Sequence, residues 1–116
     1  MDQQAVIDNE LALEMSDIVE SGRLGSTRFI RCIMEVRSEV NLETVADGWH
    51  MAFRRLIGSG PSRQVVSGDE EFALTGMTNW PGAQSAILVV GRTQEHMKPS
   101  TDLMIIGSKG AAYYSE

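Results

Sequence analysis

The sequence predicts an α+β domain, a mostly antiparallel sheet of five to six strands with two helices packed on one face. Two stretches with helical spacing of apolar residues lie within the first 57 residues, separated by a strand-like segment. Further strand-like segments with short turns fill the remainder, and neighbouring strands joined by short turns pair antiparallel. A chain of 116 residues is long enough for one core, so we expect a single domain over residues 1–116.

The first helix is predicted at about Glu10–Ser21, with Asp8 or Asn9 as its N-cap and Gly22 as its end. The second helix is predicted at about Val45–Ile57 and ends at a Gly-Ser-Gly-Pro sequence. Each carries one apolar stripe. The stripes are Leu11, Met15, Ile18 and Val19 in the first helix, and Trp49, Phe53, Leu56 and Ile57 in the second.

A long strand is predicted at Thr27–Ser38, because apolar residues alternate along it. Glu95–Ser100 reads as a loop, and the tail Asp102–Tyr114 reads as a closing hairpin. The apolar face of the long strand comprises Ile30, Cys32, Met34 and Val36. The other predicted strands are Arg63–Ser67, Glu71–Thr78 and Gln84–Thr93.

The segment Gln84–Thr93 is apolar on both faces, as is much of the final hairpin. Two helices can cover only one face of the sheet, so a second apolar face indicates a partner. We therefore expect a homodimer formed through the sheet face. The alternative is a central strand that loops shield from solvent.

Composition narrows the class of protein. The formal net charge is −6 and the ten basic residues are scattered, which disfavours nucleic acid as a partner. No apolar run reaches the length of a membrane span, and the N-terminus lacks a signal-peptide pattern. The single cysteine, Cys32, excludes an internal disulfide, which fits a reducing compartment. We therefore expect a cytoplasmic protein without a membrane partner.

Four segments, in order along nearly the whole chain, resemble the C-terminal domain of the glucose-fructose oxidoreductase/inositol dehydrogenase (Gfo/Idh/MocA) family. They comprise a helix, turn and strand; a Gly-x-His sequence; a strand and turn; and the tail with its Ile-Gly-Ser-Lys-Gly-Ala sequence. In residues these are Asn9–Leu11 with Asp17–Arg31, Gly48–His50, Phe72–Leu74 with Pro81–Ala83, and Asp102–Tyr114.

The resemblance implies a nucleotide-binding Rossmann domain before this one, binding NAD or NADP through a Gly-x-Gly-x-x-Gly loop. The present sequence contains no such loop, and it lacks the family's Glu-Lys-Pro motif, since Lys98-Pro99 comes too late in the chain. We therefore expect no cofactor bound by this chain alone. NAD(P) enters only if a separate Rossmann-domain protein supplies it.

In the family, the histidine of an Asp-x-Gly-x-His motif commonly acts as general acid/base, which suits a side chain that titrates near neutrality. Gly48 and His50 match, but Ala46 occupies the position of the acid, and Asp47 lies one residue away. Candidate catalytic residues are His50 and Asp47. Candidate ligand-binding residues are Trp49 and Arg54. The alternative is a histidine that packs beside Trp49.

Other reactive residues favour structural roles. Cys32 lies on an apolar strand face, which indicates an inert thiol rather than a nucleophile. His96 stands beside Glu95 in a polar loop, and two distant histidines and one cysteine make no metal site. Lys109 lies in a tight turn where an anion could bind. Trp80, at a Pro-Gly turn, reads equally as an exposed contact or as a cover for the sheet edge.

The sequence therefore supports a stand-alone, oxidoreductase-like domain that is non-catalytic alone and serves oligomerisation or small-molecule binding near the second helix. Two alternatives remain. One is a subunit of a split NAD(P)-dependent oxidoreductase whose Rossmann partner is a separate chain. The other is an unrelated small α+β ligand-binding domain.

Overall fold

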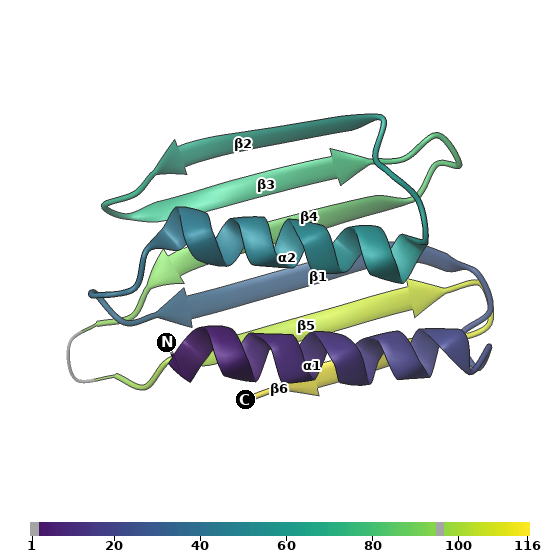
Figure 1. Cartoon of the computed structure of the whole chain (residues 1–116), viewed down its shortest axis with the longest axis horizontal. Coiled ribbons are helices and arrows are strands. Elements are labelled where there is room, and N and C mark those ends of the chain that lie inside the picture. Colours follow the sequence, from purple (N-terminus) through teal and green to yellow (C-terminus); the bar gives the residue numbers. More distant parts are fainter. Residues whose placement is uncertain (1–2, 95–96) are drawn as a thin grey trace.

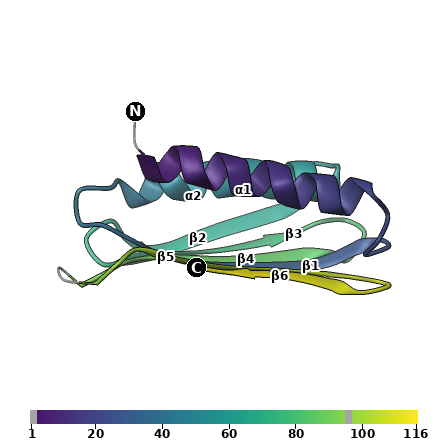
Figure 2. The ribbon, with the colours of Figure 1, turned by 90° about the horizontal axis from the view of Figure 1, so that it is seen from below.

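The computed structural model describes residues 3–94 and 97–116 and has two layers (Figures 1 and 2). One layer is a six-stranded sheet, and the other is a pair of helices that both lie on the same face of it. The predicted fold class is confirmed. In chain order the elements are α1 (Gln3–Glu20), β1 (Thr27–Val36), α2 (Leu42–Ile57), β2 (Arg63–Asp69), β3 (Ala73–Asn79), β4 (Ser85–Arg92), β5 (Ser100–Gly107) and β6 (Ala111–Ser115).

The strand order across the sheet is β2-β3-β4-β1-β5-β6, so β1 is a central strand. It pairs antiparallel with β5 and parallel with β4, whereas all other neighbouring pairs are antiparallel. The sheet is therefore mixed, with one parallel pair. That pair arises because α2 and the β2–β3 hairpin separate β1 from β4 in the chain, which gives the chain room to return in the same direction.

The helices are longer at their N-termini than the apolar stripes indicated. Helix α1 begins at Gln3, so Asp8 and Asn9 lie inside it and the expectation that either caps it was wrong. Gly22 does take the left-handed conformation after its last turn, with a φ of 80°. Helix α2 begins at Leu42 because the Asn41 side chain accepts a hydrogen bond of 2.8 Å from the Thr44 N–H.

The core lies between the helices and the sheet, and alternate strand residues point into it. As predicted, Ile30, Cys32, Met34 and Val36 of β1 are buried on this side. Strands β4 and β5 continue the same layer, because their helix-facing residues lie beside those of β1 in the register. The largest fully buried side chains include Trp49, Phe53, Leu24, Leu42, Leu88, Leu103 and Ile105.

A Glu70–Arg92 pair ties the start of α2 to the sheet. The Glu70 carboxylate accepts hydrogen bonds from the backbone N–H groups of Leu42 (2.5 Å) and Glu43 (3.1 Å), the free donors of the first helical turn. Arg92, at the end of β4, contacts Glu70 at 3.3 Å. Its guanidinium also donates to the carbonyls of Arg37, Ser38, Val40, Glu70 and Glu71.

Replacing Arg92 with Met should lower the free energy of unfolding by about 1–3 kcal/mol, because it leaves several carbonyls and the Glu70 carboxylate without their donor. Urea denaturation followed by circular dichroism measures this difference. The same substitution at Arg23, an exposed turn residue, is the control and should change stability by less than about 0.5 kcal/mol. Equal losses for the two variants would contradict a special role for Arg92.

Candidate functional site

His50 lies on the face of α2 that packs against the sheet, and only 6% of its surface is exposed. Its imidazole faces Gly76 of β3 so closely that a Cβ on this glycine would lie 2.5 Å from the His50 Nε2. The ring also meets Phe53 edge-on, with a centroid separation of 6.1 Å. The glycine therefore makes the space that the histidine occupies.

Burial lowers the pKa of His50 below its usual value, because the charged imidazolium loses its hydration. The nearby Asp47 carboxylate opposes this shift, and the nearby Arg54 guanidinium adds to it. Within the described part of the chain, the buried Nε2 has no hydrogen-bond partner. His50 is consequently a neutral imidazole with one free ring nitrogen directed at the sheet.

The structure brings three of the four predicted site residues together. Asp47 and Arg54 are exposed on α2, near enough to His50 to influence its charge. Trp49 instead belongs to the core, with 2% of its surface exposed and its indole N–H 2.8 Å from the Met34 sulfur. The charges of Asp47 and Arg54 alter the proton affinity of the His50 imidazole, and Arg54 also presents a positive charge at the surface.

The other candidate residues that the structure describes pack within the fold. Cys32 is buried on the helix-facing side of β1. Trp80 is 3% exposed and its indole N–H donates to the Ser59 carbonyl at 2.9 Å, so it packs on the domain. His96 lies outside the described residues. Among those described, no three His, Cys, Asp or Glu side chains gather as a metal site would require.

The turn that carries Lys109 binds the chain itself. The backbone N–H groups of Ser108 and Lys109 donate to the carbonyls of Ser26 and Leu24, each at 2.9 Å. They are therefore not available to hold an anion. The glycines of this turn do not adopt positive φ, since the glycines with positive φ in the described chain lie elsewhere. Gly107 is instead required by close approach, since a Cβ there would meet the Leu24 carbonyl oxygen at 2.1 Å.

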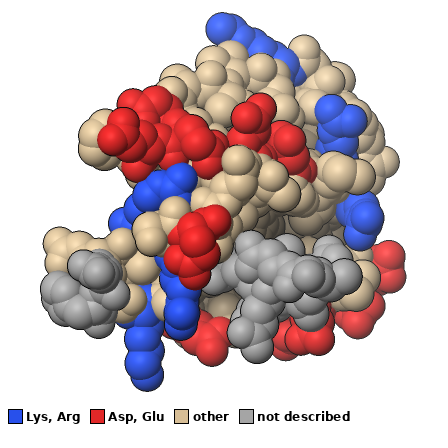
Figure 3. Space-filling view, turned by 60° about the vertical axis from the view of Figure 1, so that its left-hand side comes forward, with Lys and Arg blue, Asp and Glu red and all other residues tan. Residues whose placement is uncertain are grey.

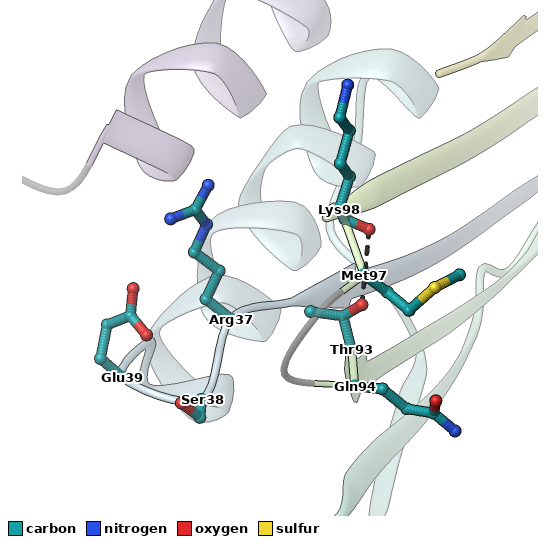
Figure 4. A pocket seen from close by; sticks show the side chains of 7 residues that line it. All are labelled: Arg37, Ser38, Glu39, Thr93, Gln94, Met97 and Lys98. Atoms are coloured by element: carbon teal, nitrogen blue, oxygen red, sulfur yellow. Dashed lines mark hydrogen bonds between the residues drawn. The ribbon is translucent and has the colours of Figure 1, made fainter.

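A hollow of about 680 Å³ lies at the end of the sheet, between the segment that follows β1 and the segment that follows β4 (Figure 4). Two of its side chains, Arg37 and Lys98, are cationic and extend to the same side in this view. The others that line it are Ser38, Glu39, Thr93, Gln94 and Met97. No local sequence pattern indicates this hollow, because only the parallel pairing of β1 with β4 brings the two segments together.

The hollow is polar and open, which suits a small ionised or hydrogen-bonding ligand better than an apolar one. On the face shown in Figure 3, acidic and basic side chains alternate and no continuous basic patch forms. In the described residues, no helix is both long enough and apolar enough to cross a membrane.

The buried, neutral state of His50 predicts that stability depends on pH. Its folded-state pKa lies below the value in the unfolded chain, about 6.5, so the unfolded state binds the proton more readily. The contribution of neutral His50 to the free energy of unfolding should be complete above about pH 6.5. It should fall as the pH drops toward the folded-state pKa. Urea unfolding at closely spaced pH values between 5 and 7.5 measures this slope.

The His50→Leu variant is the control, because it fills the same space without a titratable group. It should lose most of the slope that the wild type shows between pH 5 and 6.5. A wild-type protein whose stability rises as the pH falls through this range would contradict the neutral assignment.

Comparison with known proteins supports a likeness of fold. No protein-family model and no curated protein matches the sequence. Solved structures do match. A probable dehydrogenase from Thermotoga maritima aligns with a TM-score of 0.72 and 14% sequence identity, and the alignment covers 88% of this chain and 37% of that one. Scyllo-inositol dehydrogenase from Lactobacillus casei (0.66, 18%) and GenD2 from gentamicin A biosynthesis, solved with NAD (0.66, 13%), each match over 90% of this chain and 36% of theirs.

This chain thus spans little more than a third of the length of the dehydrogenases that it matches. The likeness expected from the four sequence segments is confirmed at the level of fold. The chain has the fold of the C-terminal domain of Gfo/Idh/MocA-type dehydrogenases.

Proposed function

We propose that this chain is an assembly domain that forms a homodimer through the bare face of its sheet and has no catalytic activity by itself. The observation that carries the proposal is the distribution of the helices. Both cover the same face, and the described chain places no helix or loop layer over the other (Figure 2). We refer to that uncovered side as the open face.

The open face carries apolar side chains on all six strands. The register places one row of side chains from Val65 through Met77 and Ile87 to Met104 and Tyr113, interrupted by Arg31 on β1. Neighbouring rows add further apolar groups, and an apolar sheet face of this extent is typical of an interaction surface. Those that remain strongly exposed are Ile33, Val65, Met77, Ile106 and Tyr113.

Two of the charges on the open face, near its centre, are already paired. Arg31 contacts Asp102 at 3.3 Å, and the Tyr113 hydroxyl donates to the other Asp102 oxygen at 2.6 Å. A charge that has an intramolecular partner costs less to bury than an isolated one. The polar centre of the face is therefore compatible with an interface, and a second copy offers a matching apolar surface.

Replacing Ile33 with Lys should halve the molecular mass measured by light scattering at micromolar concentration. Ile33 is exposed at the middle of the open face, and an unpaired buried charge costs several kcal/mol, more than the roughly 1.5–3 kcal/mol that the burial of isoleucine supplies. Leu13→Lys is the matched control, because Leu13 is exposed on α1, on the opposite side of the domain. It should leave the mass unchanged.

A wild-type chain that is monomeric at these concentrations would refute the dimer. So would an Ile33→Lys variant with the wild-type mass and a normal melting curve, because the open face would then remain unused.

A second candidate is a split dehydrogenase in which a separate Rossmann chain binds NAD(P) and docks on the α2 side. It is favoured by the grouping of His50, Asp47 and Arg54, which resembles the family's acid/base motif in part. GenD2, which shares the fold, was solved with NAD. In this case His50 would need to gain access to substrate, and Arg54 would contact an anionic group.

The two candidates differ in their response to NAD(H). The isolated chain should show no change in melting temperature in millimolar NAD or NADH, because no phosphate-binding loop is found in its sequence and ligands stabilise only the state that binds them. A clear upward shift for the chain alone would contradict the proposal that it binds no cofactor. Hydride transfer that appears only after a Rossmann protein is added, and that His50→Leu abolishes, would instead establish the split enzyme.

A further inference from the structure

Strand β2 forms one edge of the sheet, and Figure 1 shows no strand beyond it. All seven of its residues, Arg63–Asp69, are exposed. An edge strand presents a row of unpaired backbone N–H and C=O groups that another strand can join. Proteins usually block such an edge with lysine, with proline or by covering it, and β2 has neither of these residues and lies outside the helix layer.

The sequence of β2 is complementary to itself when read in the opposite direction. In an antiparallel pair of two copies centred on Val66, each Arg63 stands opposite Asp69 of the other copy. Gln64 then faces Gly68, and Val66 faces its own copy at the two-fold axis. Opposite charges directly across an antiparallel pair stabilise it, and valine favours strands.

The geometry of the sheet places both charges on the same side. Residues of a strand that are an even number apart share a face, so Arg63 and Asp69 both lie on the open face, together with Val65. Directly opposed residues of an antiparallel pair also share a face. The two Arg63–Asp69 pairs would therefore lie on one side of the joined sheet.

The side chains of Arg63 and Asp69 can both take part in an ion pair with another copy. Neither salt bridge found among the described residues involves Arg63. Asp69 uses Oδ1 to accept hydrogen bonds from the N–H groups of Glu71 (2.8 Å) and Phe72 (3.1 Å) in the β2–β3 turn. That turn holds the carboxylate in place and leaves Oδ2 for the partner.

We propose that two copies of this chain join edge to edge through β2, as an antiparallel pair about a two-fold axis at Val66, with Arg63 of each copy on Asp69 of the other. This interface is distinct from the open-face dimer and does not depend on it. The opposite edge fits less well, since β6 has five residues and no charge. A β2–β6 contact between copies would also be head-to-tail and would not close as a two-fold dimer.

The test is a charge reversal measured in the Ile33→Lys background, in which open-face contacts are removed. A dimer should persist there, and adding Arg63→Glu should convert it to monomer. Arg23→Glu, which makes the same charge change at an exposed turn residue, should leave the dimer intact. Asp69→Asn keeps the acceptor for the turn but removes the charge, and should raise the dissociation constant roughly 2- to 10-fold.

Mixing provides the decisive measurement. In the Ile33→Lys background, Arg63→Glu and Asp69→Arg chains should each be monomeric alone, yet equimolar mixtures should form a heterodimer, because every cross-strand pair is then complementary. If Asp69→Arg does not fold, hydrogen exchange on the wild type replaces it. Alternate β2 amides should be protected at high concentration and should exchange rapidly at low concentration.

Three results would overturn the edge pairing: β2 amides that exchange rapidly at every concentration, an Arg63→Glu variant that stays dimeric in the Ile33→Lys background, or species that grow continuously with concentration. If Ile33→Lys leaves the wild-type mass unchanged, the open-face proposal fails alone, and the Arg63→Glu comparison is made in the wild-type chain.

Discussion

The sheet has six strands and two faces, and the described residues supply helices for only one of them. This constraint determines the rest of the structure. It divides β1 into a buried set, including Ile30 and Met34, and an outward set, including Arg31 and Ile33. The same division into buried and outward residues continues in β4 and β5, because their registers with β1 pair residues that lie on the same face of the sheet. A core therefore forms on one side, and apolar surface remains on the other.

The parallel pairing of β1 with β4 is the second determinant, and it acts at the sheet end. It brings the segment after β1 next to the segment after β4, which is where Arg92 bonds to the carbonyls that precede α2. Glu70 then receives the first N–H groups of α2 from the other side. The same juxtaposition creates the hollow between Arg37 and Lys98. One topological feature thus orients the helix that carries His50 and forms the polar hollow.

Sequence patterns predicted the elements well where either the helical or the strand periodicity of apolar residues dominates. The alternation in β1 and the stripe of α2 indicated buried residues correctly, including Cys32 and Phe53, but Ile57 of that stripe is only partly buried. Element starts were less accurate, because a cap such as Asn41 depends on only one or two residues. The parallel pair was not predicted, since strand adjacency is set by packing over the whole sheet rather than by a local pattern.

The candidate site shows the same limit more sharply. The spacing of Gly48 and His50 resembles a catalytic motif, yet nothing in that spacing indicates that His50 meets Gly76 on a strand 26 residues later. The glycine could have been recognised as significant only as an apparent break in a strand, which often marks a close approach. Trp49 likewise reads as a possible ligand contact, and only its position on the helix decides that it packs on Met34.

The two proposed interfaces are geometrically compatible. Antiparallel edge pairing has its two-fold axis perpendicular to the sheet, so both copies keep their helices on one side and their open faces on the other. The result is a wider continuous sheet whose apolar face doubles in area. Packing two such sheets face to face uses an axis that lies parallel to them, and perpendicular two-fold axes that intersect generate a closed tetramer. The apolar face and the exposed edge that two helices leave uncovered can therefore both be buried by copies of this one chain.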